Sequence, residues 1–287
     1  MDWLNTMKNA IQYMEDRLDG EIDVEEAARA ACSSKFHFQR MFHMLTGVTI
    51  AEYVRRRRLT LAAQDLNSSS TKVIDVALKY GYDSPESFAK AFQKLHGITP
   101  SSAREPGVKL KAYPRLSFHI ALIGAKDMNY KIVDKEEFEV IGKLIRVSCR
   151  DGENLRIIPQ FWKESHEQGL IRQMEELSDM SDSYGICMDF DSTQEEMSYM
   201  IAIDRIEGAL PTDWVEKVIP TATWAVFESV GAMPNAIQDV WQRIYSEWFP
   251  SMGYEHAGGP ELEVYPAEDA SDDNYRCEVW IPIKKKS

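Results

Sequence analysis

The sequence is poor in cysteine and has no long apolar run. Its four cysteines, Cys32, Cys149, Cys187 and Cys277, lie far apart and form no C-x-x-C pair. This spacing argues against a disulfide framework and a zinc site, and it fits a reducing cytoplasm. No stretch approaches the ~18–20 consecutive apolar residues of a membrane span, and the acidic first twenty residues lack the basic head of a signal peptide. We therefore expect a cytoplasmic protein with no membrane partner, metal or cofactor.

Charge is divided unevenly along the chain. The 287 residues carry a net charge of −13. Residues 1–120 hold 17 Lys and Arg against 14 Asp and Glu, whereas residues 121–287 hold 16 against 32. A phosphate backbone would be attracted to the first part and repelled by the second. The length also suggests about two domains of ~100–200 residues each.

The first hundred residues contain one short unit twice. The run FHFQRMFHMLTGVTI at 36–50 returns as ESFAKAFQKLHGITP at 86–100, with Phe38, Phe42 and Gly47 matched fifty positions later. Glycines, capping residues and Pro85 divide this region into short and longer helices. The helix expected from Thr49 to about Asn67 joins the two units. The pattern predicts an all-α domain of two helix-turn-helix units.

The longer helix of the first unit has one apolar and one polar face. Phe38, Met41 and Phe42 recur at helical spacing and are assigned to the core. The opposite face carries the side chains that read base edges and bind phosphate, namely Lys35, Phe36, Gln39, Arg40 and His43. A joining helix of roughly 27 Å, plus the width of the units, can reach two successive major grooves ~34 Å apart. The run RRRR at 55–58 is expected to be mostly solvent-exposed, with one or two phosphate contacts.

Two motif sets in this region resemble the DNA-binding domain of the AraC/XylS family of bacterial transcription regulators. One is SSKFHFQRMFHMLTGVTIAEYVRRRRLTLAAQDL, and the other is VIDVALKYGYDSPESFAKAFQKLHGITPSSAR. The resemblance implies base reading from Phe36, Gln39 and Arg40 in the first unit and from Pro85, Glu86, Ser87 and Lys90 in the second. Since Pro85 cannot donate and Glu86 would repel phosphate, we expect the first unit to dominate sequence readout.

From Tyr130 onward the periodicity changes to that of an α+β domain. A strand at 138–148, a helix at 158–168 and strands at 184–190 and 197–204 are followed by the same order again. The second set is a strand at 222–231, a helix at 236–249 and strands at 261–266 and 277–283. Two pseudo-symmetric strand-helix-strand-strand repeats predict two helices on one sheet face and a cleft on the symmetry axis. Residues 1–107 and 130–287 are thus the two domains, and 108–129 are assigned as the linker.

Several segments of the second domain resemble the GyrI-like effector-binding domain of Rob-type AraC-family regulators. They include FEVIGKLIRV, IPQFW, VIPTATWAVFESVG, IYSEWFPSMGYEHAGGPELEVYP and EVWIPI. The resemblance implies a pocket of aromatic side chains over a buried carboxylate, which takes up organic molecules that are often cationic. It also places the carboxylate in the Phe-Glu segment, at Glu228, which shares a strand face with Trp224 and Val226. The alternative is a solvated Glu228 where the strand reaches the surface. Candidate pocket walls are Phe161, Trp162, Tyr199, Trp248, Tyr254, Tyr265 and Trp280, although core packing is the better explanation for each of them taken alone.

The sequence thus predicts a cytoplasmic DNA-binding transcription regulator, typically an activator that works with RNA polymerase at promoter DNA. A small cationic or amphipathic organic ligand would control it. One alternative is a DNA binder fused to a small-molecule hydrolase that uses a pocket glutamate and tyrosine. Another is a protein-interaction module with a vestigial cleft. Product analysis with candidate substrates would test the hydrolase, and a filled, solid core between the two helices of the second domain would favour the interaction module.

Overall fold

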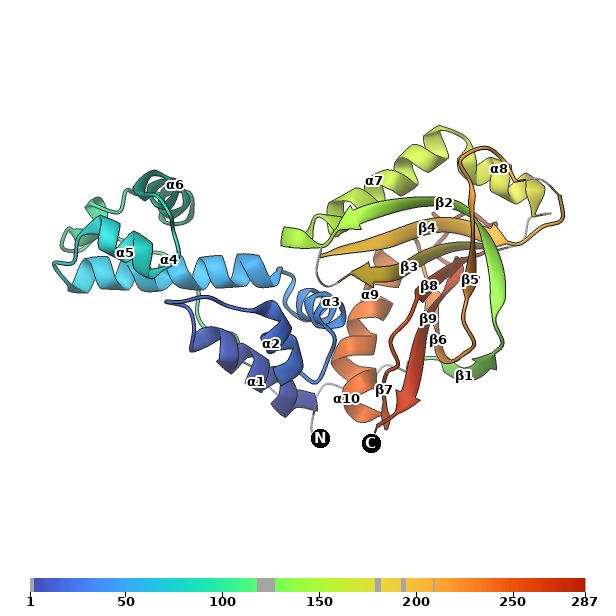
Figure 1. Cartoon of the computed structure of the whole chain (residues 1–287), viewed down its shortest axis with the longest axis horizontal. Coiled ribbons are helices and arrows are strands. Elements are labelled where there is room, and N and C mark those ends of the chain that lie inside the picture. The colour runs from blue at the N-terminus through green and yellow to red at the C-terminus, as the bar shows by residue number, and fades with distance from the viewer. Residues whose placement is uncertain (1–2, 118–126, 179–181, 192–194, 209, 287) are drawn as a thin grey trace. The chain divides into compact units, whose positions relative to one another are not determined.

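The computed structural model describes residues 3–117, 127–178, 182–191, 195–208 and 210–286. The chain forms two compact units, residues 1–121 and 122–287. Figure 1 shows the first as all helical and the second as a curved sheet with helices, so the predicted fold class is confirmed. None of the described helices is long and apolar enough to cross a membrane.

The first unit consists of two small helical groups that share one long helix, α4. The helices are α1 (Trp3–Glu15), α2 (Val24–Ala30), α3 (Lys35–Thr46), α4 (Ile50–Ser68), α5 (Val73–Lys79) and α6 (Pro85–His96). Ile50, Tyr53 and Val54 of α4 are buried toward its first half, and Leu59 to Leu66 supply the buried residues of its second half. Both groups therefore pack against apolar residues of the same helix, as expected for a duplicated helix-turn-helix.

Local sequence fixes where the longer helices begin and end. Ser34 and Ser84 cap α3 and α6 by accepting backbone hydrogen bonds from His37 and Ser87, which satisfies N–H groups that the first turn leaves unpaired. Gly47 and Gly97 end the same helices at φ +70° and +79°. A residue with a side chain is strained in this left-handed conformation, so glycine is favoured at both ends.

The arginine run at 55–58 is only partly solvent-exposed: Arg55 is exposed, as expected, whereas Arg57 and Arg58 are occupied by bonds within the first unit. Arg57 makes two 2.8 Å hydrogen bonds to the Glu15 carboxylate, and both side chains are about 90% buried. Arg58 donates to the carbonyl oxygens of Leu18 and Gly20. Arg55 and Arg56 both pair with Glu52 one turn earlier. The run therefore fastens α4 to α1 and to its own first turn.

The segment assigned as a linker, 108–129, is structured at both ends of its described part. Residues 110–116 pack along α4, where the backbone N–H of Tyr113 donates to Thr60. At the other end, the Asn129 side chain donates to Glu228 of the second unit. The first end of the segment thus belongs to the first unit, and its last residue belongs to the second.

The second unit contains an antiparallel sheet in the order β1-β6-β9-β8-β3-β4-β2-β5, with β7 paired to β9. Its strands are β1 (Tyr130–Lys135), β2 (Phe138–Ser148), β3 (Ser183–Asp191), β4 (Glu196–Asp204), β5 (Val215–Ile219), β6 (Ala222–Val230), β7 (Tyr254–His256), β8 (Glu261–Tyr265) and β9 (Arg276–Lys285). Its helices are α7 (Asn154–Glu167), α8 (Leu170–Leu177), α9 (Asn235–Arg243), a π-helical turn (Ile244–Trp248) and α10 (Phe249–Ser251). Figure 1 shows how strongly this sheet bends.

The predicted strand-helix-strand-strand repeat is present twice. The first copy is β2-α7-β3-β4 and the second is β6-α9-β8-β9, and the two copies join where β3 pairs with β8. Each copy has a leading strand that the sequence did not reveal. The leading strands are exchanged, since β1 pairs with β6 of the second copy and β5 pairs with β2 of the first.

The two faces of this sheet have different roles. Trp224, Val226 and Leu262 belong to an apolar core on one face, together with side chains of β2, β3 and β4. Residues alternate between faces along a strand, so Glu263 lies on the opposite face. Helices α7 and α9 contact that opposite face, because Trp162 of α7 bonds to Tyr199 and Trp241 of α9 bonds to Glu263.

In the first unit, His96 is a buried histidine held neutral by its surroundings. It is 4% exposed, and its Nε2 lies 3.1 Å from the carbonyl oxygen of Leu59. Its Nδ1 accepts from the backbone N–H of Lys111, so Nε2 carries the proton. Burial lowers the pKa of His96, and the charge of Lys111 lowers it further, while the bond to Leu59 acts in the other direction.

Acidification should destabilise the isolated first unit, residues 1–121, more in the wild type than in His96→Gln. The unfolded chain binds a proton at this histidine below about pH 6.5, whereas the folded state resists protonation, so stability falls as pH falls through that range. We expect the difference in free energy of unfolding between the two proteins to narrow as the pH is lowered from 7.5 to 5.5. Urea titrations at both pH values measure this, and a constant difference would contradict it.

Candidate DNA-binding face and candidate effector site

The first candidate site is the outward face of α3. Phe38, Met41 and Phe42 are buried and fix the inner face of this helix. At ~100° per residue, Phe36, Gln39 and Arg40 therefore lie away from the buried inner face, and Lys35 flanks them. All four side chains are partly buried. The structure thus brings the predicted base-reading residues of the first unit onto one helix face.

Helix α6 presents the corresponding face of the second helix-turn-helix. Its Phe88 and Phe92 are buried, whereas Glu86, Ser87 and Lys90 are exposed in its first two turns and follow Pro85. The hydroxyl of Ser87 donates to the backbone carbonyl of Ser84, so it helps to cap the helix. Of these side chains, only Lys90 offers a positive charge to a phosphate.

The second candidate site surrounds the carboxylate of Glu263, on the helix-contacted face of β8. Trp241 of α9 donates its indole N–H to Oε1 of Glu263 at 2.7 Å. The hydroxyl of Tyr265 donates to Oε2 at 2.8 Å. Burial, together with the negative charge of Glu263, raises the pKa of Tyr265 well above its ordinary value, so this hydroxyl stays protonated and remains a donor.

Aromatic side chains from α7 and β4 complete the surroundings of Glu263. The ring of Trp162 lies 5.2 Å from that of Tyr265, edge to face, and its indole N–H donates to the Tyr199 hydroxyl at 2.7 Å. Phe161 contacts Tyr199 with ring centroids 6.5 Å apart. Tyr199 and Trp241 are buried, whereas the other aromatic residues and Glu263 are half-buried. The site is therefore an acidic group among aromatic rings that solvent partly reaches.

A glycine opposite Glu263 keeps this arrangement open. Gly185 of β3 pairs in register with Glu263 across the junction of the two repeats. A Cβ on Gly185 would lie 2.5 Å from the Tyr199 hydroxyl and 3.3 Å from both Oε2 of Glu263 and Trp162. Any other residue here would displace the side chains that surround the carboxylate.

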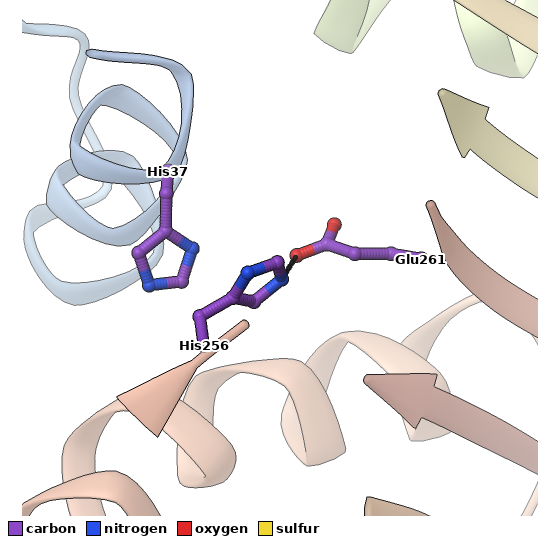
Figure 2. A group of neighbouring side chains, drawn as sticks. All are labelled: His37, His256 and Glu261. Carbon is purple, nitrogen blue, oxygen red and sulfur yellow. Dashed lines mark hydrogen bonds and ion pairs between the residues drawn. The ribbon is translucent and has the colours of Figure 1, made fainter. Parts of the chain in front are cut away.

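A second carboxylate on β8 anchors the helix that carries Trp241. Glu261 is 2% exposed and accepts from the hydroxyl of Tyr245 at 3.2 Å. It also accepts from Nε2 of His256 at 3.1 Å, the bond drawn in Figure 2. The backbone N–H of Gly258 donates to His256 Nδ1, which places the ring proton on Nε2. Two carboxylates two residues apart on a strand, ~6.8 Å, match two donors four residues apart on a helix, ~6 Å. This match fixes the helix over the strand.

The structure distributes the sequence-predicted effector residues among three places. Four of the eight surround Glu263: Phe161, Trp162, Tyr199 and Tyr265. Trp248 and Tyr254 stack on each other, 5.9 Å apart, in a separate cluster with Phe227. Trp280 lies on the other sheet face, against Trp224.

Glu228, the carboxylate chosen from the sequence, also lies on that other face. It is two and four residues from the core residues Val226 and Trp224, and residues at this spacing on a strand share a face. It forms an ion pair with Arg276 and accepts from Asn129 at 3.0 Å. The bond from Asn129, with help from Arg276, lowers its pKa. These surroundings are those of a solvated surface ion pair, and four of the seven predicted aromatic residues surround Glu263 instead.

Glu263, Trp241 and Gly185 belong to the candidate site, and none of them was predicted from the sequence. One signal was available, since IPQFW at 158–162 in the first repeat aligns with IQDVW at 237–241 in the second. That alignment pairs Trp162 with Trp241. The position of Gly185 against Glu263 depends on the register between β3 and β8, which no sequence pattern specifies.

Comparisons with known proteins agree with this division into two parts. Residues 131–283 match the family of integron-associated effector binding proteins, and residues 27–106 match a helix-turn-helix domain. The right origin-binding protein of Escherichia coli K12 is 27% identical over 99% of this chain and 100% of its own length. The transcriptional activator AarP of Providencia stuartii is 40% identical over 32% of this chain and 68% of its own length.

Among solved structures, SAV2435 bound to tetraphenylphosphonium is 22% identical, covers 55% of this chain and 94% of its own, and has a TM-score of 0.49. The sequence motifs, the duplicated helix-turn-helix and the family matches all point to the same conclusion. The chain belongs to the integron-associated effector binding protein family and joins that domain to an AraC-type DNA-binding domain, which makes it a transcription regulator with an effector-binding domain.

Proposed function

We propose that the chain binds promoter DNA through α3 and α6, and that a small organic cation at Glu263 controls this activity. The observation that carries the ligand proposal is a carboxylate among tryptophan and tyrosine rings, where the two repeats meet. A cation placed there gains both the charge of Glu263 and attraction to the ring faces. The half-buried Phe161, Trp162 and Tyr265 would contact the apolar part of the ligand.

We further propose that the protein activates transcription together with RNA polymerase in the bacterial cytoplasm. One relative of the DNA-binding part is named a transcriptional activator, which supports this direction of control. Control by a ligand requires that it bind two states of the protein with different affinity. Transcription in vitro with and without the cation, on a promoter that the protein binds, distinguishes activation from repression.

The charge of Glu263 should determine which ligands bind. Glu263→Gln keeps an acceptor oxygen for the indole N–H of Trp241 and offers an amide N–H to the oxygen of Tyr265, but it removes the negative charge. We expect at least a tenfold loss of affinity for methyltriphenylphosphonium, about 1.4 kcal/mol, and less than a threefold change for the neutral triphenylphosphine oxide. Isothermal titration calorimetry on the full chain gives both values.

Glu228→Gln is the matched control, since it removes the same charge from the other sheet face. Binding of both compounds should remain within twofold of wild type. A selective loss of the cation in this variant would return the ligand site to Glu228. An equal loss of both compounds in Glu263→Gln would mean that Glu263 acts through shape alone.

Arg40 and Lys90 should contribute to DNA binding in different ways. A bidentate contact from Arg40 to a base would make Arg40→Ala cost ~1–3 kcal/mol and relax specificity at one position. Lys90→Ala should weaken binding by a similar factor on every sequence, because phosphates carry no sequence information. Fluorescence anisotropy with a duplex selected from random DNA, its single-base variants and a scrambled duplex measures both effects.

The exposed Lys163 of α7, in the other unit, supplies the control for charge alone. Lys163→Ala should leave DNA affinity unchanged. If Arg40→Ala loses equal affinity for the selected and scrambled duplexes, Arg40 does not read a base.

A further inference from the structure

The segment from Leu110 to Leu116 runs along α4 as an extended strap. Leu110, Tyr113 and Leu116 are partly buried, and the residues between them are exposed. Inward residues at every third position are typical of a polyproline II conformation, which has three residues per turn. Pro114 favours this conformation and also restricts Tyr113 to it.

The strap has contacts with both helical groups of the first unit. In the second group, Leu110 packs against the core formed by α4, α5 and α6, and Lys111 N–H donates to His96 of α6. In the first, the hydroxyl of Tyr53 accepts from Leu116 N–H at 3.3 Å and donates to Glu15 of α1 at 2.6 Å.

Tyr113 holds the middle of the strap. Its N–H donates to Thr60 at 3.0 Å, and its carbonyl accepts from Arg57 at 2.7 Å. Its ring packs on Tyr53 at 6.2 Å and under the guanidinium of Arg56 at 5.2 Å. Arg57 also binds Glu15, so one arginine ties the strap and α1 to α4.

The spacing of these contacts matches on the two elements. Thr60 and Tyr53 are seven residues apart on α4, which is ~10.5 Å of helix. Their partners, the N–H groups of Tyr113 and Leu116, are three residues apart, which is ~9.3 Å of polyproline II chain. The strap therefore bonds to two turns of α4 without bending either element.

Both helix-turn-helix groups attach to α4, and each could rock about its attachment. Arg58 restrains this motion by bonding to Leu18 and Gly20 of the first group, while its guanidinium lies close to Gly81 of the second. The strap adds a further connection, through different residues, between α6 and α1. A restraint on rocking is a restraint on the distance between the outward faces of α3 and α6.

We propose that Tyr113 and the strap at 110–116 are specificity-determining elements for DNA, because they fix the spacing between the two recognition helices. This inference rests on the proposed binding of DNA by both α3 and α6. The protein would then discriminate between DNA sites by the separation of two short segments as well as by their bases. Loosening the strap should leave contact with each segment intact while the required separation becomes less strict.

The test uses full-length protein and a duplex selected from random DNA, together with a derivative that has one base pair inserted between the two protected segments. Wild type should bind the insertion duplex at least twentyfold more weakly. In Tyr113→Ala, the ratio of the dissociation constant for the insertion duplex to that for the selected duplex should be at least fivefold smaller than in wild type. Thr60→Val, which removes the acceptor for Tyr113 N–H and keeps side-chain shape, should give a smaller change in the same direction if Tyr113→Ala does not fold.

Lys109→Ala is the control. Lys109 is exposed, so this substitution removes a charge next to the strap and leaves the contacts of the strap unchanged. Its ratio should equal that of wild type. Equal losses on both duplexes in the folded Tyr113 and Thr60 variants would overturn the proposal and leave the strap a purely stabilising role. Footprinting that protects only one segment would instead overturn the underlying proposal that both α3 and α6 bind DNA.

Discussion

The antiparallel pairing of β3 with β8 is the interaction on which the second unit depends. It joins the two repeats into one sheet and sets Gly185 opposite Glu263. The helices of both repeats then bring an aligned tryptophan to the same place, Trp162 from α7 and Trp241 from α9. A shift of one residue would turn Glu263 into the apolar core, where an unpaired carboxylate is strongly unfavourable. Fold and candidate effector site therefore rest on the same register.

The two repeats share a fold but contribute different chemistry to this junction. The second repeat supplies the carboxylate and its two donors, while the first supplies space at Gly185 and the ring of Trp162. A symmetric junction would hold two carboxylates, whose repulsion would raise the cost of burying either. The asymmetry leaves a single negative charge, which suits recognition of a single positive one.

Sequence patterns predicted most of the fold because those patterns are local. Caps and glycines placed the ends of α3 and α6, and alternation placed β2 at its observed bounds. The short edge strands β1 and β5 escaped prediction because their pairing partners lie in the opposite repeat. The candidate DNA-binding face follows from helical periodicity together with the family resemblance, so its residues could be named in advance.

The candidate effector site was less predictable because it depends on sheet register and on long-range partners. Glu228 and Glu263 both lie on strands that also carry core residues, and only the partners Arg276 and Trp241 distinguish a surface ion pair from an enclosed carboxylate. The arginine run at 55–58 shows the same limit. Arg57 and Arg58 resemble phosphate contacts until the positions of Glu15 and Leu18 are known.

The exchange of leading strands affects the order in which the two units can fold during synthesis. Tyr130 in β1 pairs with Phe227 in β6, almost a hundred residues later, whereas the helices of the first unit rely on neighbouring residues. Contacts between distant residues form slowly because a long loop must close first. During synthesis, the helical unit can fold before β5, the edge strand that pairs with β2 of the first repeat, has been synthesised. A ribosome would therefore release a protein whose DNA-binding part matures before the part that senses the effector.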